Sequence, residues 1–125
     1  MKKSTLILIA LLTTILISCS GSDVYRGKWK ATNKSGEKFE IVFKEKEFAI
    51  TNNGETKSFE YKQMSINIEN SVETYGIKLE DGRSLHIQFP IGSTETKGAI
   101  LDANKRPVYI IDRNNYIGYK DVYGL

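Results

Sequence analysis

Apolar and polar residues alternate along most of the chain beyond Asp23. In one segment Phe39, Ile41 and Phe43 share a face, and in another Phe59 and Tyr61 do so. A period of two places successive side chains on opposite faces of an extended strand, so each strand has one apolar and one hydrated face. Half-buried strands of this kind are typical of antiparallel sheets. The pattern predicts an all-β fold, a small antiparallel meander β-barrel or sandwich of about eight strands.

The predicted strands are short and are separated by turn-forming residues. They cover residues 24–33, 38–46, 48–51, 56–63, 65–69, 73–79, 84–89, 99–102 and 108–112. The turn NNGE follows the third of them, and the turn EDGR follows the sixth; a glycine in such a turn accepts the positive φ of a hairpin. A reversal near residue 64 separates the fourth strand from the fifth. Closure of the strands into a barrel would bury their apolar faces and remove exposed edges.

The first residues break the alternation. Lys2 and Lys3 precede an uncharged apolar run from Thr5 to Ile17 (TLILIALLTTILI). As a helix this run would span roughly 20 Å, which is less than the ~30 Å hydrocarbon core of a bilayer. A basic start, a short apolar run and small residues after it are typical of a secretory signal. Residues 1–18 are therefore predicted to be a cleaved signal peptide.

The apolar run ends in Leu16-Ile17-Ser18-Cys19, and Cys19 is the only cysteine of the chain. This tetrad resembles the lipobox of bacterial lipoproteins. The resemblance implies cleavage before Cys19, diacylglycerol on its thiol and a further acyl chain, such as palmitate, on the new amine. Several acyl chains anchor a protein durably to a lipid bilayer, whereas one binds only marginally. The alternative is a free thiol, because an internal disulfide needs a second cysteine.

The residues around the lipobox also indicate location and domain organisation. In the sorting rule of enterobacterial lipoproteins, aspartate after the lipidated cysteine retains the protein at the inner membrane. Ser20 stands there, so the resemblance implies the outer membrane if the organism is Gram-negative. Residues 19–23 would form a lipidated tether and residues 24–125 a single domain. Loss of Lys2 and Lys3 lowers the formal net charge from +3 to +1, which argues against a nucleic-acid partner.

The start of the first predicted strand carries Gly27-Lys28-Trp29. This triplet resembles the Gly-x-Trp element of lipocalins and their shorter bacterial relatives, in which the tryptophan plugs one end of the barrel. The resemblance implies that a hollow barrel would carry an apolar ligand. The inward-facing side chains that would line such a cavity are Trp29, Phe39, Phe43 and Phe59.

No motif for catalysis or for a cofactor is evident in the sequence. His86 is the only histidine, and its position between Leu85 and Ile87 places it on the hydrated face of its strand. Metal-ligand spacings, a nucleophile motif and a phosphate-binding glycine loop are missing. The acidic pairs Glu45/Glu47 and Glu80/Asp81 are predicted to form a hydrated rim rather than an acid–base or calcium site. The sequence therefore favours a protein that is not an enzyme and that needs neither cofactor nor metal.

Tyrosines are concentrated near the C-terminus. The spacing of Tyr116, Tyr119 and Tyr123 would align three rings on one side of a short C-terminal helix. One interpretation is that the rings plug the open end of the barrel. The other is that they form a binding patch for a protein, since tyrosine is enriched at interfaces.

Two functional hypotheses follow. The first is a membrane-anchored, non-enzymatic binding module for another protein of the cell envelope, for example of the inhibitor or immunity type. The alternative is a lipocalin-like carrier of a small apolar ligand. Small barrels are often filled by their own side chains, so the state of the interior separates the two.

Overall fold

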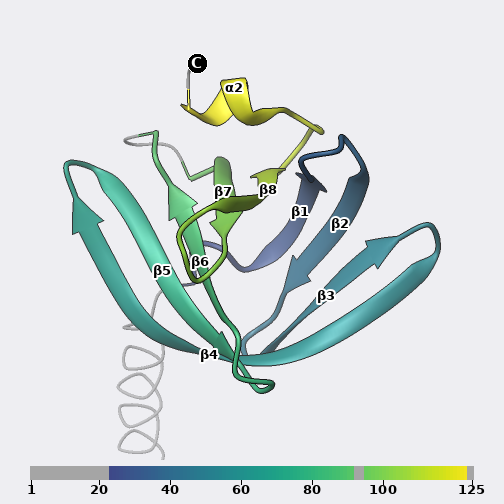
Figure 1. Ribbon diagram of the computed structural model, residues 1–125, viewed down its shortest axis with the longest axis horizontal. Coiled ribbons are helices and arrows are strands. Elements are labelled where there is room, and N and C mark those ends of the chain that lie inside the picture. The colour runs from purple at the N-terminus through teal and green to yellow at the C-terminus, as the bar shows by residue number, and fades with distance from the viewer. Residues whose placement is uncertain (1–22, 92–94, 124–125) are drawn as a thin grey trace, which may run out of the picture.

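The computed structural model describes residues 23–91 and 95–123, and Cys19 and the predicted signal lie outside them. Eight antiparallel strands form a closed barrel in chain order, and β8 returns to pair with β1 (Figure 1). The predicted all-β meander barrel is confirmed. The strands are β1 Gly27–Thr32, β2 Lys38–Phe43, β3 Glu47–Asn52, β4 Glu55–Glu69, β5 Val72–Leu79, β6 Ser84–Phe89, β7 Lys97–Leu101 and β8 Pro107–Asp112.

Strand β4 differs from the sequence-based expectation. The predicted reversal near residue 64 is wrong, because Glu55–Glu69 is one continuous strand. Its register shifts between Gln63 and Ser65, which leaves Met64 as the extra residue of a bulge. A bulge interrupts the alternation and bends the strand, so the sequence pattern resembles that of a turn.

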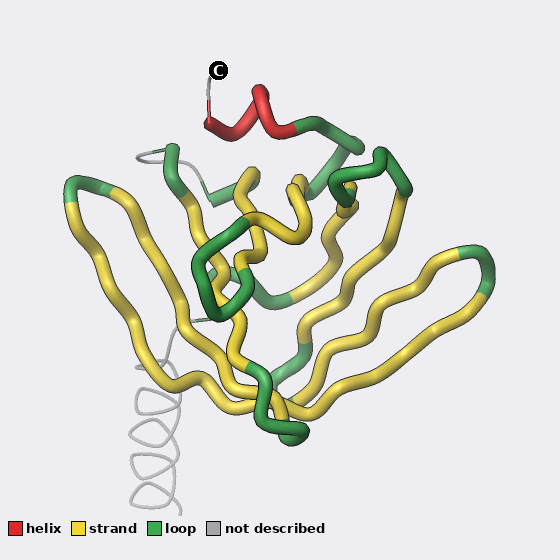
Figure 2. Tube along the Cα trace, viewed as in Figure 1, coloured by secondary structure: helices red, strands yellow, loops and turns green. Residues whose placement is uncertain are grey.

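The long β4 belongs to two hairpins that point in different directions. Its first part pairs with β3, from Glu55 to Glu60, and its second part pairs with β5, from Tyr61 to Glu69. Figure 2 shows that the β3–β4 and β4–β5 hairpins diverge on opposite sides of the barrel. Asn53 and Gly54 turn the first hairpin and Asn70 and Ser71 the second, all with positive φ. The turns at NNGE and EDGR are confirmed, with Gly82 also at positive φ.

The core lies inside the barrel, where the alternating apolar positions point. Phe39, Ile41 and Phe43 share the inner face of β2, as the alternation predicts, although Phe39 is only half-buried. The fully buried large side chains lie toward one end of the barrel. They are Trp29, Tyr25, Phe89, Ile41, Ile77, Ile87 and Ile111.

That end is closed by the segment before β1 and by the residue after β8. The Trp29 indole N–H donates to the Tyr25 carbonyl over 2.7 Å. The Arg113 guanidinium lies 3.7 Å from the centre of the Trp29 ring and donates to the carbonyls of Lys28 and Val24. A cation held against a tryptophan face in this way is stabilising. The two ends of the domain are thus joined across Trp29.

The short helix α2, Tyr119–Tyr123, confirms the predicted C-terminal helix. The Gly118 N–H donates to the Asp121 carboxylate, which satisfies a free donor at the helix start. Val122 packs with Ala99, Leu101 and Ile110, whose neighbours in sequence point into the barrel. The helix therefore covers the outer wall of β7 and β8 and does not plug an end. Within the described residues, no helix has the length and apolarity needed to cross a membrane.

Candidate functional site

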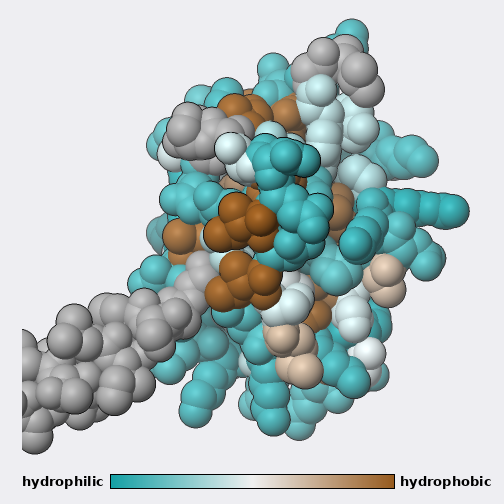
Figure 3. Space-filling view, turned by 90° about the vertical axis from the view of Figure 1, so that its left-hand side faces the viewer, coloured by the Kyte–Doolittle hydropathy of each residue, from teal (hydrophilic) through white to brown (hydrophobic). Residues whose placement is uncertain are grey.

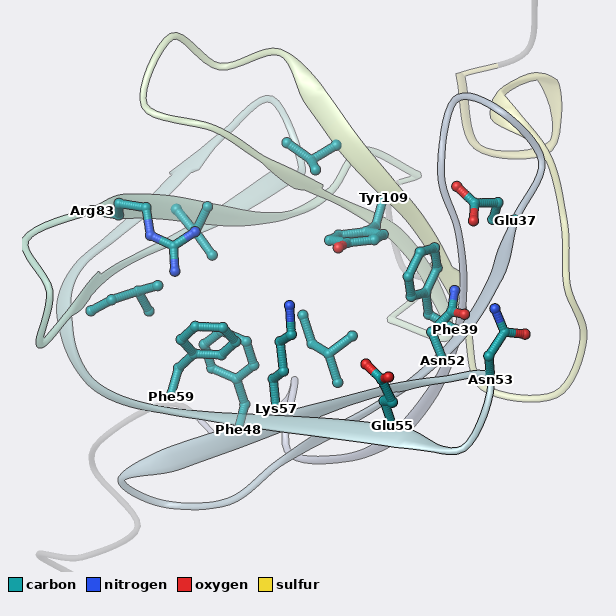
Figure 4. Close-up of a pocket in the computed structure, with 14 residues that line it drawn as sticks. Glu37, Phe39, Phe48, Asn52, Asn53, Glu55, Lys57, Phe59, Arg83 and Tyr109 are labelled. Carbon is teal, nitrogen blue, oxygen red and sulfur yellow. The ribbon is translucent and has the colours of Figure 1, made fainter.

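A cavity of about 480 Å³ opens at the barrel end opposite Trp29. This end carries the β1–β2, β3–β4, β5–β6 and β7–β8 turns, where the β3–β4 hairpin diverges from the rest (Figure 1). Figure 4 shows the side chains that reach into it. The cavity is lined by Glu37, Phe39, Phe48, Ile50, Asn52, Asn53, Glu55, Lys57, Phe59, Leu79, Arg83, Leu85, Val108 and Tyr109.

The wall of the cavity is largely aromatic. Phe39 meets Tyr109 edge to face, with ring centres 5.1 Å apart, and Phe48 stacks on Phe59 at 5.3 Å. Ile50, on β3 with Phe48, adds aliphatic surface. These are inward positions of β2, β3, β4 and β8. They contact one another in pairs and leave space between the pairs, because the strands separate toward this end.

Two basic side chains extend into the cavity, Lys57 beside Phe48 and Arg83 on the side away from Glu37 and Asn53 (Figure 4). Lys57 comes from β4, and its side chain forms no ion pair or hydrogen bond among the described residues. Arg83 lies 5.1 Å from the centre of the Phe59 ring and forms a 2.8 Å ion pair with Asp81. The Arg83 hydrogen bonds lower the pKa of the Asp81 carboxyl. Arg83 is therefore already neutralised, whereas the Lys57 charge is available to a ligand.

The remaining polar groups lie at the rim. Figure 4 shows Glu37, Glu55, Asn52 and Asn53 together on one side of the cavity. On the inner side lies the Tyr109 hydroxyl, which is protonated at neutral pH; burial raises its pKa further above the ordinary value. The cavity thus offers an aromatic interior, one phenol, one free ammonium and a mixed polar rim.

Only two of the four residues predicted from the sequence to line a ligand cavity do so. Phe39 and Phe59 line it, but Trp29 and Phe43 do not; they are buried in the solid core toward the other end. The expectation that all four share one cavity is wrong, because the barrel is filled at one end and open at the other. Sequence reasoning also missed Lys57, which the alternation places on the same inward face as Phe59.

The three C-terminal tyrosines do not form one patch. Tyr119 and Tyr123 stack in α2, with ring centres 4.7 Å apart, and the Tyr123 hydroxyl donates to Gln88. Tyr116 precedes the helix and lies beneath the ammonium groups of Lys30 and Lys38, at 5.1 and 5.2 Å. Burial raises the pKa of Tyr123 to about 12, whereas Tyr119 is 45% exposed. The expected alignment of three rings along one helix is therefore reduced to two.

The other candidate groups are dispersed. His86 is half-buried rather than fully hydrated, and burial lowers its pKa. Glu80 lies near Glu60, whose pKa it raises through a shared hydrogen bond and charge repulsion. Asp81 pairs with Arg83, and Glu47 pairs with Lys44 at 3.7 Å. Among residues 23–91 and 95–123, no group of three or more His, Cys, Asp or Glu side chains is placed to hold a metal ion.

Searches of protein-family models, curated proteins and solved structures found no match to this chain. The case for a function therefore depends on the cavity itself.

Proposed function

We propose that this protein is a lipid-anchored binding barrel of the cell envelope that holds a small amphipathic anion in its open end. The cavity between the aromatic walls, with the free Lys57 ammonium extending into it, carries this proposal. Cys19 would hold the barrel at the membrane. We therefore prefer the sequence-based alternative, a carrier of a small ligand, over a protein-binding module. The proposed ligand differs from the apolar one expected from the sequence in that it carries a negative charge.

The size and surface of the cavity support a small molecule. Ligand sites are typically hollows of about 300–1,000 Å³, mostly apolar, with a few polar groups that orient the ligand. The volume here, about 480 Å³, falls within that range. Phe39, Phe48, Phe59 and Tyr109 supply the apolar contact.

The position of Lys57 supports a negative charge on the ligand. The Lys57 side chain is exposed and has no acidic partner among the described residues, so a bound anion would supply a charge-assisted contact for its ammonium group. The acidic residues Glu37 and Glu55 lie on the rim side of the cavity, so they disfavour a second negative charge outside it. A ligand with an apolar body and one anionic group satisfies both parts of the site.

Two fluorescent probes with apolar bodies of similar size test whether the cavity prefers an anionic ligand. 8-Anilinonaphthalene-1-sulfonate is anionic, and N-phenyl-1-naphthylamine is neutral. Residues 20–125 exported behind an ordinary cleavable signal would give the barrel without lipid. Lys57→Met keeps the side-chain stem and removes the charge. We expect it to weaken binding of the anionic probe about tenfold, which corresponds to the loss of one charge-assisted contact of roughly 1.4 kcal/mol. Binding of the neutral probe should be unchanged. Equal loss for both probes would contradict the role of Lys57.

A second pair of variants tests whether the probes bind inside the cavity. Ile50 lines the cavity and Ala49, its neighbour on β3, pairs with Val42 and Ser58 on the outer face. Ile50→Trp should fill the cavity and abolish binding of both probes, whereas Ala49→Trp should not. Thermal unfolding followed by circular dichroism would establish whether each variant is folded. Unchanged probe binding in a folded Ile50→Trp variant would reject the cavity as the site.

The hypothesis of an envelope protein partner stays a prediction. The exposed ring of Tyr119 is the feature that favours it, since Tyr123 is held against Gln88. Tyr119→Ala should cost no more than the stacking contact with Tyr123, about 0.5–1.5 kcal/mol, and should remove any partner captured from native membranes with the unaltered chain. Capture of the same partner by both chains would exclude Tyr119 from the contact.

A further inference from the structure

The second part of β4 has a free edge. From Lys62 to Glu69 this strand pairs with β5, and no ladder on its other side occurs within the described residues. The last contacts to the β2–β3 region are at Tyr61, whose N–H donates to the Lys46 carbonyl. Figure 1 shows the β4–β5 hairpin extending away from the β3–β4 hairpin. An edge of this kind presents unpaired backbone donors and acceptors to another strand.

The free edge is also apolar. Met64 and Ile68 are each 63% exposed and Ile66 is 46% exposed. Figure 3 views the molecule from the side on which the β4–β5 hairpin lies in Figure 1, and apolar side chains (brown) gather there among hydrophilic ones. The first part of β4, with Thr56, Lys57 and Ser58, is polar instead. Charged and polar residues protect an edge from pairing, so the two parts of β4 differ in this respect.

We propose that the Lys62–Glu69 edge pairs with the same segment of a second copy of this chain, antiparallel and centred on Ile66. The two copies would be related by a two-fold axis through that residue. The two barrels would then share one continuous sheet from β5 of one copy to β5 of the other.

The side chains of the segment are complementary to themselves in this register. Ile66 lies opposite the partner's Ile66, and Ser65 lies opposite the partner's Asn67. Met64 is the extra residue of the bulge, so beyond it the pairing advances by one position. Gln63 then meets the partner's Ile68, and Lys62 meets the partner's Glu69. The pairing forms two symmetric ion pairs and keeps inward and outward faces matched throughout.

The charges around Lys62 favour such a partner. Lys62 lies directly opposite Lys78 in the β4–β5 ladder, and like charges in opposed positions are destabilising. A carboxylate from the second copy would offset this repulsion. No ion pair of Lys62 or of Glu69 occurs within the described part of the chain.

Space for the incoming strand exists beside the bulge. A groove of about 890 Å³ lies next to Lys62, Gln63 and Met64. Its other charged lining residues are Arg26, Lys46 and Lys78, with Glu45, Glu60 and Glu80. Neighbouring strands need about 4.8 Å between their axes. The groove accommodates the end of the partner's β4, including the partner's Glu69.

Cysteine cross-linking in the native membrane, with the full chain, tests the pairing and its register. Opposed residues of antiparallel strands have Cα atoms about 4.5–5.5 Å apart, within the range for a disulfide. Ile66→Cys should give a disulfide-linked dimer on mild oxidation. Ser58→Cys, also exposed but on the polar part of β4, is the matched control, and the unaltered chain controls for Cys19. Dimer from Ile66→Cys no more abundant than from Ser58→Cys would overturn the proposal.

Charge reversal separates a second copy from any other occupant. In the Ile66→Cys background, Lys62→Glu and Glu69→Lys should each reduce the cross-linked dimer at least about threefold, as expected for two weak exposed ion pairs. The chain with both reversals should recover it, because the pairs are re-formed with opposite sign. Failure of the double reversal to recover the dimer would refute this register. A cross-linked product that contains a different protein would refute the proposal that the partner is a second copy of this chain.

Discussion

Replacement of Arg113 tests whether one side chain holds the closed end of the barrel together. Its guanidinium covers the Trp29 ring at 3.7 Å and donates to two carbonyls, those of Lys28 at 3.0 Å and Val24 at 2.9 Å. Arg113→Met keeps the length and apolar stem of the side chain and removes the charge and all donors. The change therefore isolates the polar contacts of the guanidinium from its packing.

The magnitude follows from those contacts. A cation over an aromatic face contributes about 0.5–2 kcal/mol, and a hydrogen bond from a charged donor contributes about 1.5 kcal/mol at the lower end. The Lys28 bond is exposed to water and the Val24 bond is partly buried, which reduces the sum. We expect a loss of about 2–3 kcal/mol of unfolding free energy. For a domain of this size the melting temperature should fall by roughly 10–20 °C.

Urea unfolding of the exported, lipid-free barrel is the assay. Trp29 is the only tryptophan, so its fluorescence reports this end of the barrel, and far-ultraviolet circular dichroism reports the strands. Arg106→Met is the control, because Arg106 is exposed and a surface change of this kind is usually within about 0.5 kcal/mol. A loss from Arg113→Met no larger than that of the control would refute the reasoning.

Three further predictions concern other parts of the chain. Asp112→Ala should cost about 1–3 kcal/mol in urea unfolding, because the buried Asp112 carboxylate accepts the backbone N–H groups of Asn114 and Asn115 at 2.7 Å each; an unchanged midpoint would contradict this. Burial lowers the pKa of His86 below 6.5 in the folded state, so the unfolded chain binds more protons as pH falls below that value, and stability falls with it. His86→Gln should remove that part of the acid dependence in melts from pH 7 to about pH 5, and identical slopes would refute the assignment. Cys19→Ser should abolish lipidation and release the chain from the membrane fraction, as shown by intact mass and fractionation; an unmodified thiol on the native protein would end the anchor hypothesis.

The sequence was sufficient for the barrel because the signal for each strand is local. The inner face of β2 can be predicted from Phe39, Ile41 and Phe43 without knowledge of their neighbours, since a period of two fixes the face. The same rule failed at Met64, where one extra residue interrupts the period within a single strand. A bulge and a turn both interrupt alternation, and the difference between them depends on which strands lie alongside.

The cavity was harder to predict because it depends on how far the strands diverge. Phe39 and Phe43 have the same pattern in sequence, yet the first lines open space and the second is packed against Phe48, with ring centres 5.1 Å apart. The contact between Trp29 and Arg113 was missed for a related reason. It joins the two ends of the domain, and no local pattern near Arg113 indicates a partner so distant in the chain.

The continuous course of β4 couples the two regions proposed to bind. Glu55, Lys57 and Phe59 line the cavity, residues 62–69 form the free edge, and the bulge at Met64, within that edge, bends the one unbroken strand. If an occupant of either region favoured a tighter or flatter bend at the bulge, the width of the opening and the direction of the edge would change together. By thermodynamic reciprocity, filling the cavity and pairing the edges must then strengthen or weaken each other by an equal factor. A single strand would in this way make each barrel sensitive to whether its neighbour is loaded.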